Sequence, residues 1–134
     1  MIGLVIVAHG GLAQEFLAAT EHVVGPQMNA RAISTDVDDD LSEKQAEIDA
    51  AVADVDSGEG VALVTDMFGG TPCNLALGAM TPGAVEVICG ANLPMLVKLA
   101  KMRDRPLMEA TQCAKEAGIK YISCPSAVLN TNAG

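Results

Sequence analysis

Aromatic and basic residues are both scarce in this chain of 134 residues, which has no Trp, one Tyr and two Phe, and eight Lys and Arg against 17 Asp and Glu. Proteins that bind nucleic acids need a cationic surface, and many also need aromatic side chains on which the bases stack. The composition therefore argues against nucleic acid as a partner. It also argues against a flavin, because few aromatic side chains are available to hold the ring.

The cysteines lack the spacing of a metal site or of a redox motif. They stand at Cys73, Cys89, Cys113 and Cys124, with no C-x-x-C pair and no small disulfide framework. We therefore expect reduced thiols that pack in the interior of a cytoplasmic protein.

A long apolar segment is missing as well. The apolar run over residues 2–8 is too short for a signal sequence or a membrane span, and no basic region precedes it. We interpret the run as a buried strand, and we expect a protein that does not span a membrane.

The charges are unevenly placed along the chain. Residues 1–97 contain 14 acidic residues and only two bases, Arg31 and Lys44, whereas residues 98–134 contain three acids and six bases. Half of the residues are apolar, which predicts a folded chain with a single core. We expect one domain over residues 1–124 and a C-terminal tail over residues 125–134.

Short apolar runs alternate with longer amphipathic segments, a pattern typical of a parallel sheet covered by helices. The predicted fold class is α/β, with a doubly wound, mainly parallel open sheet and helices on both faces. The expected strands are residues 2–8, 30–35, 61–65, 84–89 and a last short strand at 119–123. The expected helices are residues 12–24, 41–55, 71–80, 93–102 and 106–117, the last of them ending at Gly118.

Several residues predict how these helices begin and which side they bury. Asp40 followed by Glu43 is typical of a capping box, and Thr71 with Pro72 predicts an N-cap followed by the first helical residue. The expected buried stripes are Leu12, Phe16, Ala19 and Val23 in the first helix, and Leu41, Ile48, Val52 and Val55 in the second.

Three glycine-containing loops follow predicted strands, at the edge of the sheet where ligands of open α/β folds bind. They are His9-Gly10-Gly11, the loop from Asp66 to Thr71, and the loop from Gly90 to Pro94. His9 and Asp66 come directly after apolar runs, so their side chains meet if the first and third strands are neighbours.

A histidine beside a carboxylate has a direct chemical use. The carboxylate fixes the tautomer of the imidazole and leaves the other nitrogen as a nucleophile near neutral pH. The backbone of Gly69 and Gly70 at a helix start offers N–H donors that suit an anion, and Thr71 adds a hydroxyl. These features together predict a phosphohistidine site with no metal and no cofactor.

Other motifs are missing, and a structural role for the histidine remains an alternative. The sequence has no G-x-x-x-x-G-K-[ST], no G-x-G-x-x-G after the first strand and no G-x-S-x-G. The acidic run from Asp36 to Asp40 is interpreted as capping and solvated residues rather than a magnesium pocket. A histidine that follows a strand can also serve packing alone, and His22 is interpreted as a surface residue.

Three ordered motifs give the chain a family resemblance over about residues 1–124. It resembles the IIA domain of the mannose family of the phosphoenolpyruvate-dependent sugar phosphotransferase system (PTS). The motifs are Val5-Ile6-Val7-Ala8-His9-Gly10, Val64-Thr65-Asp66-Met67-Phe68-Gly69-Gly70-Thr71-Pro72 with Asn74, and Gly90-Ala91-Asn92-Leu93-Pro94-Met95-Leu96. Leu12 and Phe68 depart from the tryptophans that some members carry.

The resemblance implies a phosphoryl carrier. His9 would take the phosphoryl group from phospho-HPr and pass it to a IIB protein, Asp66 would bind the imidazole, and Thr71 would occupy the hydroxyl position of the Gly-Gly-[Ser/Thr]-Pro turn. It also implies a homodimer that exchanges the last strand, residues 119–123 here.

Two alternatives remain open at the sequence level. The chain could be a stand-alone regulatory PTS protein whose His9 phosphorylation state controls binding to another protein, without sugar transport. It could also be the phosphotransfer subunit of a dihydroxyacetone kinase, although its glycine-rich motifs are closer to the mannose type.

Overall fold

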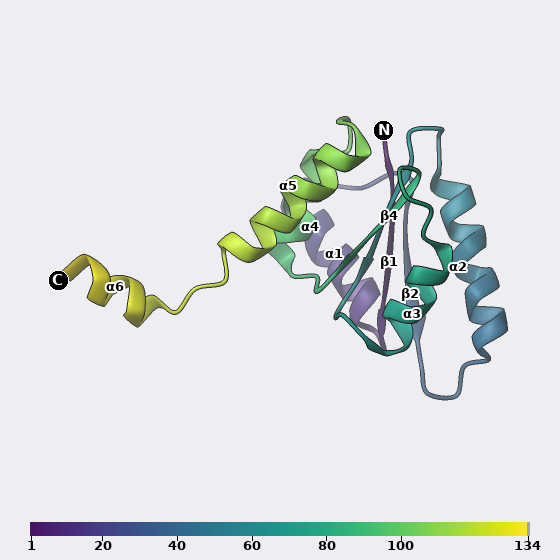
Figure 1. Cartoon of the computed structure of the whole chain (residues 1–134), viewed down its shortest axis with the longest axis horizontal. Coiled ribbons are helices and arrows are strands. Elements are labelled where there is room, and N and C mark those ends of the chain that lie inside the picture. Colours follow the sequence, from purple (N-terminus) through teal and green to yellow (C-terminus); the bar gives the residue numbers. More distant parts are fainter. Residues whose placement is uncertain (134) are drawn as a thin grey trace.

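The core of the molecule is a sheet of four parallel strands in the order β2-β1-β3-β4 (Figure 1). A computed structural model describes the backbone of residues 1–133 and the side chains of residues 1–129. The strands are β1 (Gly3–His9), β2 (Ala30–Thr35), β3 (Val61–Thr65) and β4 (Val85–Cys89). The predicted α/β class and these four strands are confirmed.

Helices cover both faces of the sheet, as the doubly wound fold requires (Figure 1). One face is covered by α1 (Leu12–Val24), α4 (Leu93–Lys101) and α5 (Leu107–Lys120), and the other by α2 (Leu41–Val55) and α3 (Gly70–Ala79). Alternate residues of β1 enter the two cores, so Leu4 and Ile6 pack under α1 and α4, while Val5 and Val7 pack under α2 and α3. Burial on both sides explains why the central strands β1 and β3 are continuous apolar runs.

The buried side of α1 differs from the predicted stripe. Ala13 and Thr20 are fully buried, and Phe16 of the predicted stripe packs partly buried against the same core, but Leu12 and Val23 are exposed. Thr20 can be buried because its hydroxyl donates to the backbone oxygen of Phe16 at 2.7 Å. The predicted stripe contains only apolar residues, so it omits the buried Thr20 and is rotated relative to the side of α1 that is buried.

The start of α2 is predicted correctly, but its first apolar residue is not buried. Asp40 is the N-cap, and its carboxylate accepts a hydrogen bond from the backbone N–H of Glu43 at 3.0 Å. Leu41 is 57% exposed, whereas Ile48 and Val55 of the predicted stripe are buried and Val52 packs partly buried against the same core.

The predicted strand at residues 119–123 is wrong. Helix α5 continues through Gly118 to Lys120, because Gly118 is a packing residue and not a helix stop. Its backbone oxygen accepts a hydrogen bond from the Asn92 side chain at 2.9 Å, and a Cβ at Gly118 would lie 3.1 Å from the Cβ of Met95. A glycine therefore lets α5 pack closely against the start of α4.

The C-terminal segment ends in a helix of its own, α6 (Pro125–Ala133), where a loose tail was expected. Figure 1 shows α6 standing away from the body of the molecule. The boundary of the domain at residue 124 stays a prediction. None of the helices within residues 1–133 has both the length and the apolar character that crossing a membrane requires.

Candidate phosphoryl-transfer site

The candidate site lies where the connections of the sheet change direction. Strand β1 lies between β2 and β3 in the sheet. The chain passes from β1 to β2 on one side and then crosses to β3 on the other side, so β1 and β3 flank the switch point. His9 is the last residue of β1 and Asp66 follows the last residue of β3. Parallel pairing of β1 with β3 brings these two residues together, as the sequence predicted.

One carboxylate oxygen of Asp66 holds His9 at two points. His9 Nδ1 lies 2.7 Å from Asp66 Oδ2, and the backbone N–H of His9 donates to the same oxygen at 3.1 Å. A carboxylate only accepts hydrogen bonds, so Nδ1 carries the proton and Nε2 of the neutral ring keeps its lone pair. The His9 side chain is 51% exposed and that of Asp66 is 9% exposed, so the nucleophilic nitrogen belongs to the accessible partner.

The carboxyl group of Asp66 remains ionised in this arrangement. Burial by itself raises the pKa of Asp66, but the hydrogen bonds from the His9 ring and from the His9 backbone outweigh burial and leave this pKa below its ordinary value. The backbone N–H of Met67 also donates to Asp66, at 3.1 Å from Oδ1. A stable negative charge next to Nδ1 favours any state in which the imidazole becomes positive.

The turn after Asp66 brings backbone close to the free nitrogen of His9. Gly69 and Gly70 have φ angles of 89° and 83°, values that side chains other than glycine rarely adopt. A Cβ at Gly70 would lie 3.6 Å from both Cε1 and Nε2 of His9. The start of α3, with N–H groups that have no partner earlier in the helix, therefore faces the imidazole.

Thr71 lies at this turn but does not cap α3. The N-cap is Gly69, and no side chain caps this helix. The Thr71 hydroxyl makes no hydrogen bond to any described residue, and Thr71 lines a hollow together with His9. Its hydroxyl is therefore available to a group bound in the hollow.

The hollow has a volume of about 740 Å³ and an acidic wall that sequence reasoning did not assign to the site. Besides His9 and Thr71 it is lined by Gly10, Thr35, Asp36, Val37, Asp38 and Asp39. Gly10 follows β1, whereas Thr35 ends β2 and the residues from Asp36 to Asp39 follow it. The strand order places the end of β2 beside the end of β1 and so brings these residues together. No lysine or arginine is among the lining residues.

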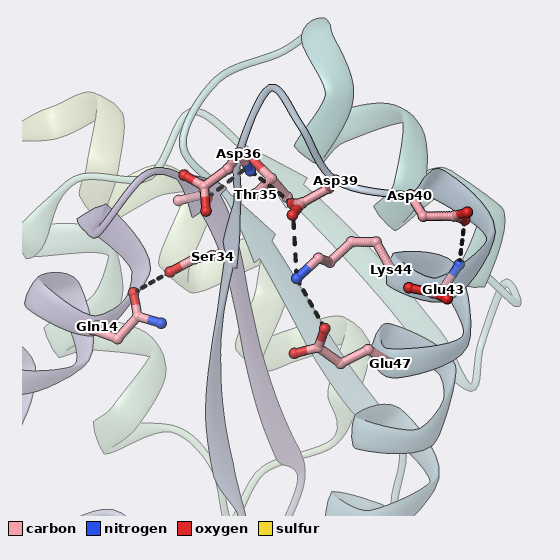
Figure 2. Close-up of polar contacts among 10 residues, drawn as sticks. Gln14, Ser34, Thr35, Asp36, Asp39, Asp40, Glu43, Lys44 and Glu47 are labelled. Carbon is pink, nitrogen blue, oxygen red and sulfur yellow. Dashed lines mark hydrogen bonds and ion pairs between the residues drawn. The ribbon is translucent and has the colours of Figure 1, made fainter.

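Lys44 holds the acidic wall in place, as Figure 2 shows. Asp39 accepts a hydrogen bond from the backbone N–H of Asp36 at 2.7 Å and lies 3.8 Å from the Lys44 ammonium group. The same ammonium group lies 2.9 Å from Glu47, and this hydrogen bond raises the pKa of Lys44 despite partial burial. The charge of Lys44 is thus committed to the wall and to α2.

The third predicted loop supports the site without lining the hollow. The backbone N–H groups of Gly90 and Ala91 donate to the oxygen of Thr65 at 3.1 and 3.0 Å, which fixes the strand end that carries Asp66. Asn92 caps α4 by accepting from the N–H of Met95 at 3.0 Å. Among the described side chains, no three His, Cys, Asp or Glu residues form a group that could hold a metal ion.

Comparison with known proteins identifies relatives over most of the chain. Residues 3–115 match the family EIIA-man, described as the PTS system fructose IIA component. The PTS system mannose-specific EIIAB component of Escherichia coli (strain K12) is 33% identical over 104 residues, which cover 77% of this chain and 32% of that protein. The chain thus spans about a third of the length of the EIIAB relatives.

Solved structures of similar fold come from the same system. The mannose/sorbose specific IIA subunit from Enterococcus faecalis superposes with a TM-score of 0.78 at 28% identity, covering 92% of this chain and 93% of that chain. The phosphotransferase system component EIIA from Streptococcus agalactiae superposes with a TM-score of 0.84 at 23% identity, covering 95% and 99%. The family match, which extends over residues 3–115, establishes that this chain belongs to the EIIA-man family, the IIA components of the phosphotransferase system.

Proposed function

We propose that the chain is a phosphoryl carrier of the PTS, which accepts a phosphoryl group from phospho-HPr on His9 and passes it to a IIB partner. The observation that carries this proposal is the geometry of His9, whose side chain is half exposed, whose Nδ1 lies 2.7 Å from Asp66 and whose Nε2 faces the turn at Gly70. The proposed site residues are His9 and Asp66 for the chemistry, and Gly69, Gly70 and Thr71 for binding the phosphoryl oxygens.

In the proposed transfer, one bond to phosphorus forms as another breaks. The lone pair of His9 Nε2 attacks phosphorus, the phosphorus–nitrogen bond of the donor phosphohistidine breaks, and its electron pair returns to the donor imidazole. The phosphorylated His9 ring keeps the proton on Nδ1 and is positively charged, so the adjacent Asp66 carboxylate stabilises it. Transfer between two histidines exchanges bonds of similar energy, so positioning the reactants in line is the main requirement.

The surroundings of His9 favour a protein as donor over a free nucleotide. The acidic wall at Asp36, Asp38 and Asp39 repels a free polyanion, whereas it attracts a protein that brings its own cation to the phosphoryl group. Val37 at the wall and Phe68 in the loop after Asp66 expose apolar side chains, 101% and 81% exposed, that a protein surface can cover. The proposed place of action is the cytoplasm.

We also propose that the chain forms a homodimer through its C-terminal segment. Exposed apolar side chains concentrate there, at Ile119, Tyr121, Ile122, Val128 and Leu129. Helix α6 has nine residues, and an isolated helix shorter than about 12 residues is marginal in water. A second copy that covers this segment accounts for both features.

Transfer from radiolabelled phospho-HPr tests the proposed carrier function. The wild-type chain should take up an acid-labile label, and His9→Ala should take up none above background. His22→Ala is the matched control, because His22 is an exposed histidine on α1 and should leave the uptake unchanged. Label on the His9→Ala variant, or no label on the wild type, would overturn the assignment.

The acceptor step separates the carrier from the regulatory alternative. If the chain is a transport component, the labelled chain should lose its label to at least one of the IIB proteins with which it is mixed. A chain that is labelled on His9 but transfers to none of the IIB proteins of its own organism would instead be the regulatory protein.

A further inference from the structure

Two cysteines meet beside the candidate site, although they are far apart in the sequence. Cys73 lies in the first turn of α3, three residues after Gly70, and is 1% exposed. Cys89 is the last residue of β4 and is partly exposed. Their Sγ atoms are 3.5 Å apart, and both thiols are free.

The position of this pair links it to both halves of the site. Cys89 lies in register with Thr65, the residue that precedes Asp66. Cys73 belongs to the helix start that brings Gly70 to His9. In contrast, Cys113 and Cys124 make no hydrogen bond to another cysteine among the described residues.

We propose that a small-molecule disulfide such as oxidised glutathione oxidises Cys73 and Cys89 to a reversible disulfide between these two residues. This bond slows phosphoryl uptake at His9. The more accessible Cys89 thiolate attacks one sulfur of the oxidant, whose sulfur–sulfur bond breaks and releases one thiolate. The buried Cys73, as its thiolate, then attacks the Cys89 sulfur of the mixed disulfide and releases the second thiol. Two protein thiols are oxidised and one small disulfide is reduced to two thiols.

The reaction should be slow at neutral pH and faster at alkaline pH. Burial raises the pKa of Cys89 above the ordinary thiol value, and the Thr65 hydroxyl opposes this only in part. Since the thiolate is the attacking species, the rate should still increase with pH where an ordinary thiol is already fully ionised. This slow reaction distinguishes the pair from a fast peroxide sensor.

The disulfide would move the turn that faces His9. Its sulfur atoms are about 2.05 Å apart, so the two thiols must approach each other from their present separation of 3.5 Å. Because β4 is on the far side of β3 from β1, a movement of Cys73 toward Cys89 would draw the start of α3 away from His9. A displacement of about 1 Å at a reacting site can cost on the order of 100-fold in rate.

The bond is tested first without any phosphotransfer. A Cys113→Ser/Cys124→Ser variant keeps only the pair, and oxidised glutathione at pH 9 should remove both titratable thiols and give one cross-linked peptide that contains Cys73 and Cys89. Adding Cys73→Ser should instead trap glutathione on Cys89, because no second thiol can displace it. Two thiols that stay reduced in the native protein, but cross-link after unfolding in urea, would overturn the proposal.

The effect on the site is tested next and rests on the proposed function. The oxidised Cys113→Ser/Cys124→Ser variant should take up label from phospho-HPr at least about tenfold more slowly than its reduced form. Dithiothreitol should restore the rate. A Cys89→Ser variant in the same background should not respond to the oxidant. Equal rates for both redox forms would overturn the link to His9, whereas no uptake by the reduced form would overturn the proposed function and leave the thiol result standing.

Discussion

At the scale of single residues, the contact between His9 and Asp66 determines which ring nitrogen can react, because Asp66 Oδ2 lies 2.7 Å from Nδ1 and leaves Nε2 free. Both residues follow buried apolar runs, and strand ends of a parallel sheet share one edge, so the pair could be predicted. The acidic wall could not be predicted as part of the site, because Asp36 and Asp39 become neighbours of His9 only through the strand order β2-β1-β3. Thr71 was placed at the right turn but given a capping role that Gly69 fills.

The pKa of Asp66 predicts a pH dependence of stability. Because its pKa in the folded state is below the ordinary value, Asp66 stabilises the fold above the ordinary carboxyl pKa, and this contribution is lost as the pH falls through the folded-state value. Asp66→Asn lacks this titration. The difference in unfolding free energy between wild type and Asp66→Asn should therefore decrease as the pH is lowered from 6 toward about 3, where carboxyl groups titrate.

Urea unfolding at several pH values, with circular dichroism as the signal, measures this difference. Asp38→Asn is the control, since Asp38 is exposed and its side chain makes no hydrogen bond to a described residue. Parallel pH profiles for wild type and Asp66→Asn would contradict the assignment of the low pKa to the contact with His9.

At the scale of helices and strands, the sequence predicts the bounds of an element best where the element is buried on both faces of the sheet. Strand β3 begins and ends at the predicted residues, because it is buried on both faces of the sheet. Residues 119–123 contain Ile119, Tyr121 and Ile122, but so short a segment does not distinguish a strand from the end of a helix. The contact of Gly118 with Asn92 and Met95 decides in favour of the helix, and such a tertiary contact is not visible in the sequence.

The N-cap of α2 gives a prediction for a whole helix. Asp40 satisfies the backbone N–H of Glu43 at 3.0 Å, and replacing an N-cap aspartate by alanine typically costs about 1 kcal/mol. Asp40→Ala should therefore lower the free energy of unfolding by about that amount. Asp38→Ala removes the same charge from the same loop without a cap, so it should change the stability by less than about 0.5 kcal/mol. Equal losses for the two variants in urea unfolding would show that loop charge, and not capping, stabilises α2.

At the scale of the whole molecule, apolar side chains are exposed both beside the candidate site and on the C-terminal segment. The acidic wall lies at the carboxyl end of the sheet, next to His9. From the end of α5 onward, the C-terminal segment exposes Ile119, Tyr121, Ile122, Val128 and Leu129. Scattered exposed apolar residues are ordinary, but their concentration on one projecting segment marks an interaction surface. Transfer partners and a second copy of the chain would thus use different surfaces.

Homodimerisation through the C-terminal segment can be tested by placing charge on it. Ile122 and Leu129 are 73% and 65% exposed, so replacing both by glutamate should leave the fold of residues 1–120 intact and convert a dimer into a monomer. Val37→Glu is the matched control, because Val37 is 101% exposed but lies at the acidic wall, and this variant should remain dimeric.

Light scattering after size-exclusion chromatography gives the mass, and circular dichroism checks the fold. A wild-type chain that is monomeric at micromolar concentration, or a double variant that remains dimeric, would contradict a dimer built on this segment. Because His9 lies at the end of β1, away from the segment, the monomeric variant should still accept a phosphoryl group from phospho-HPr.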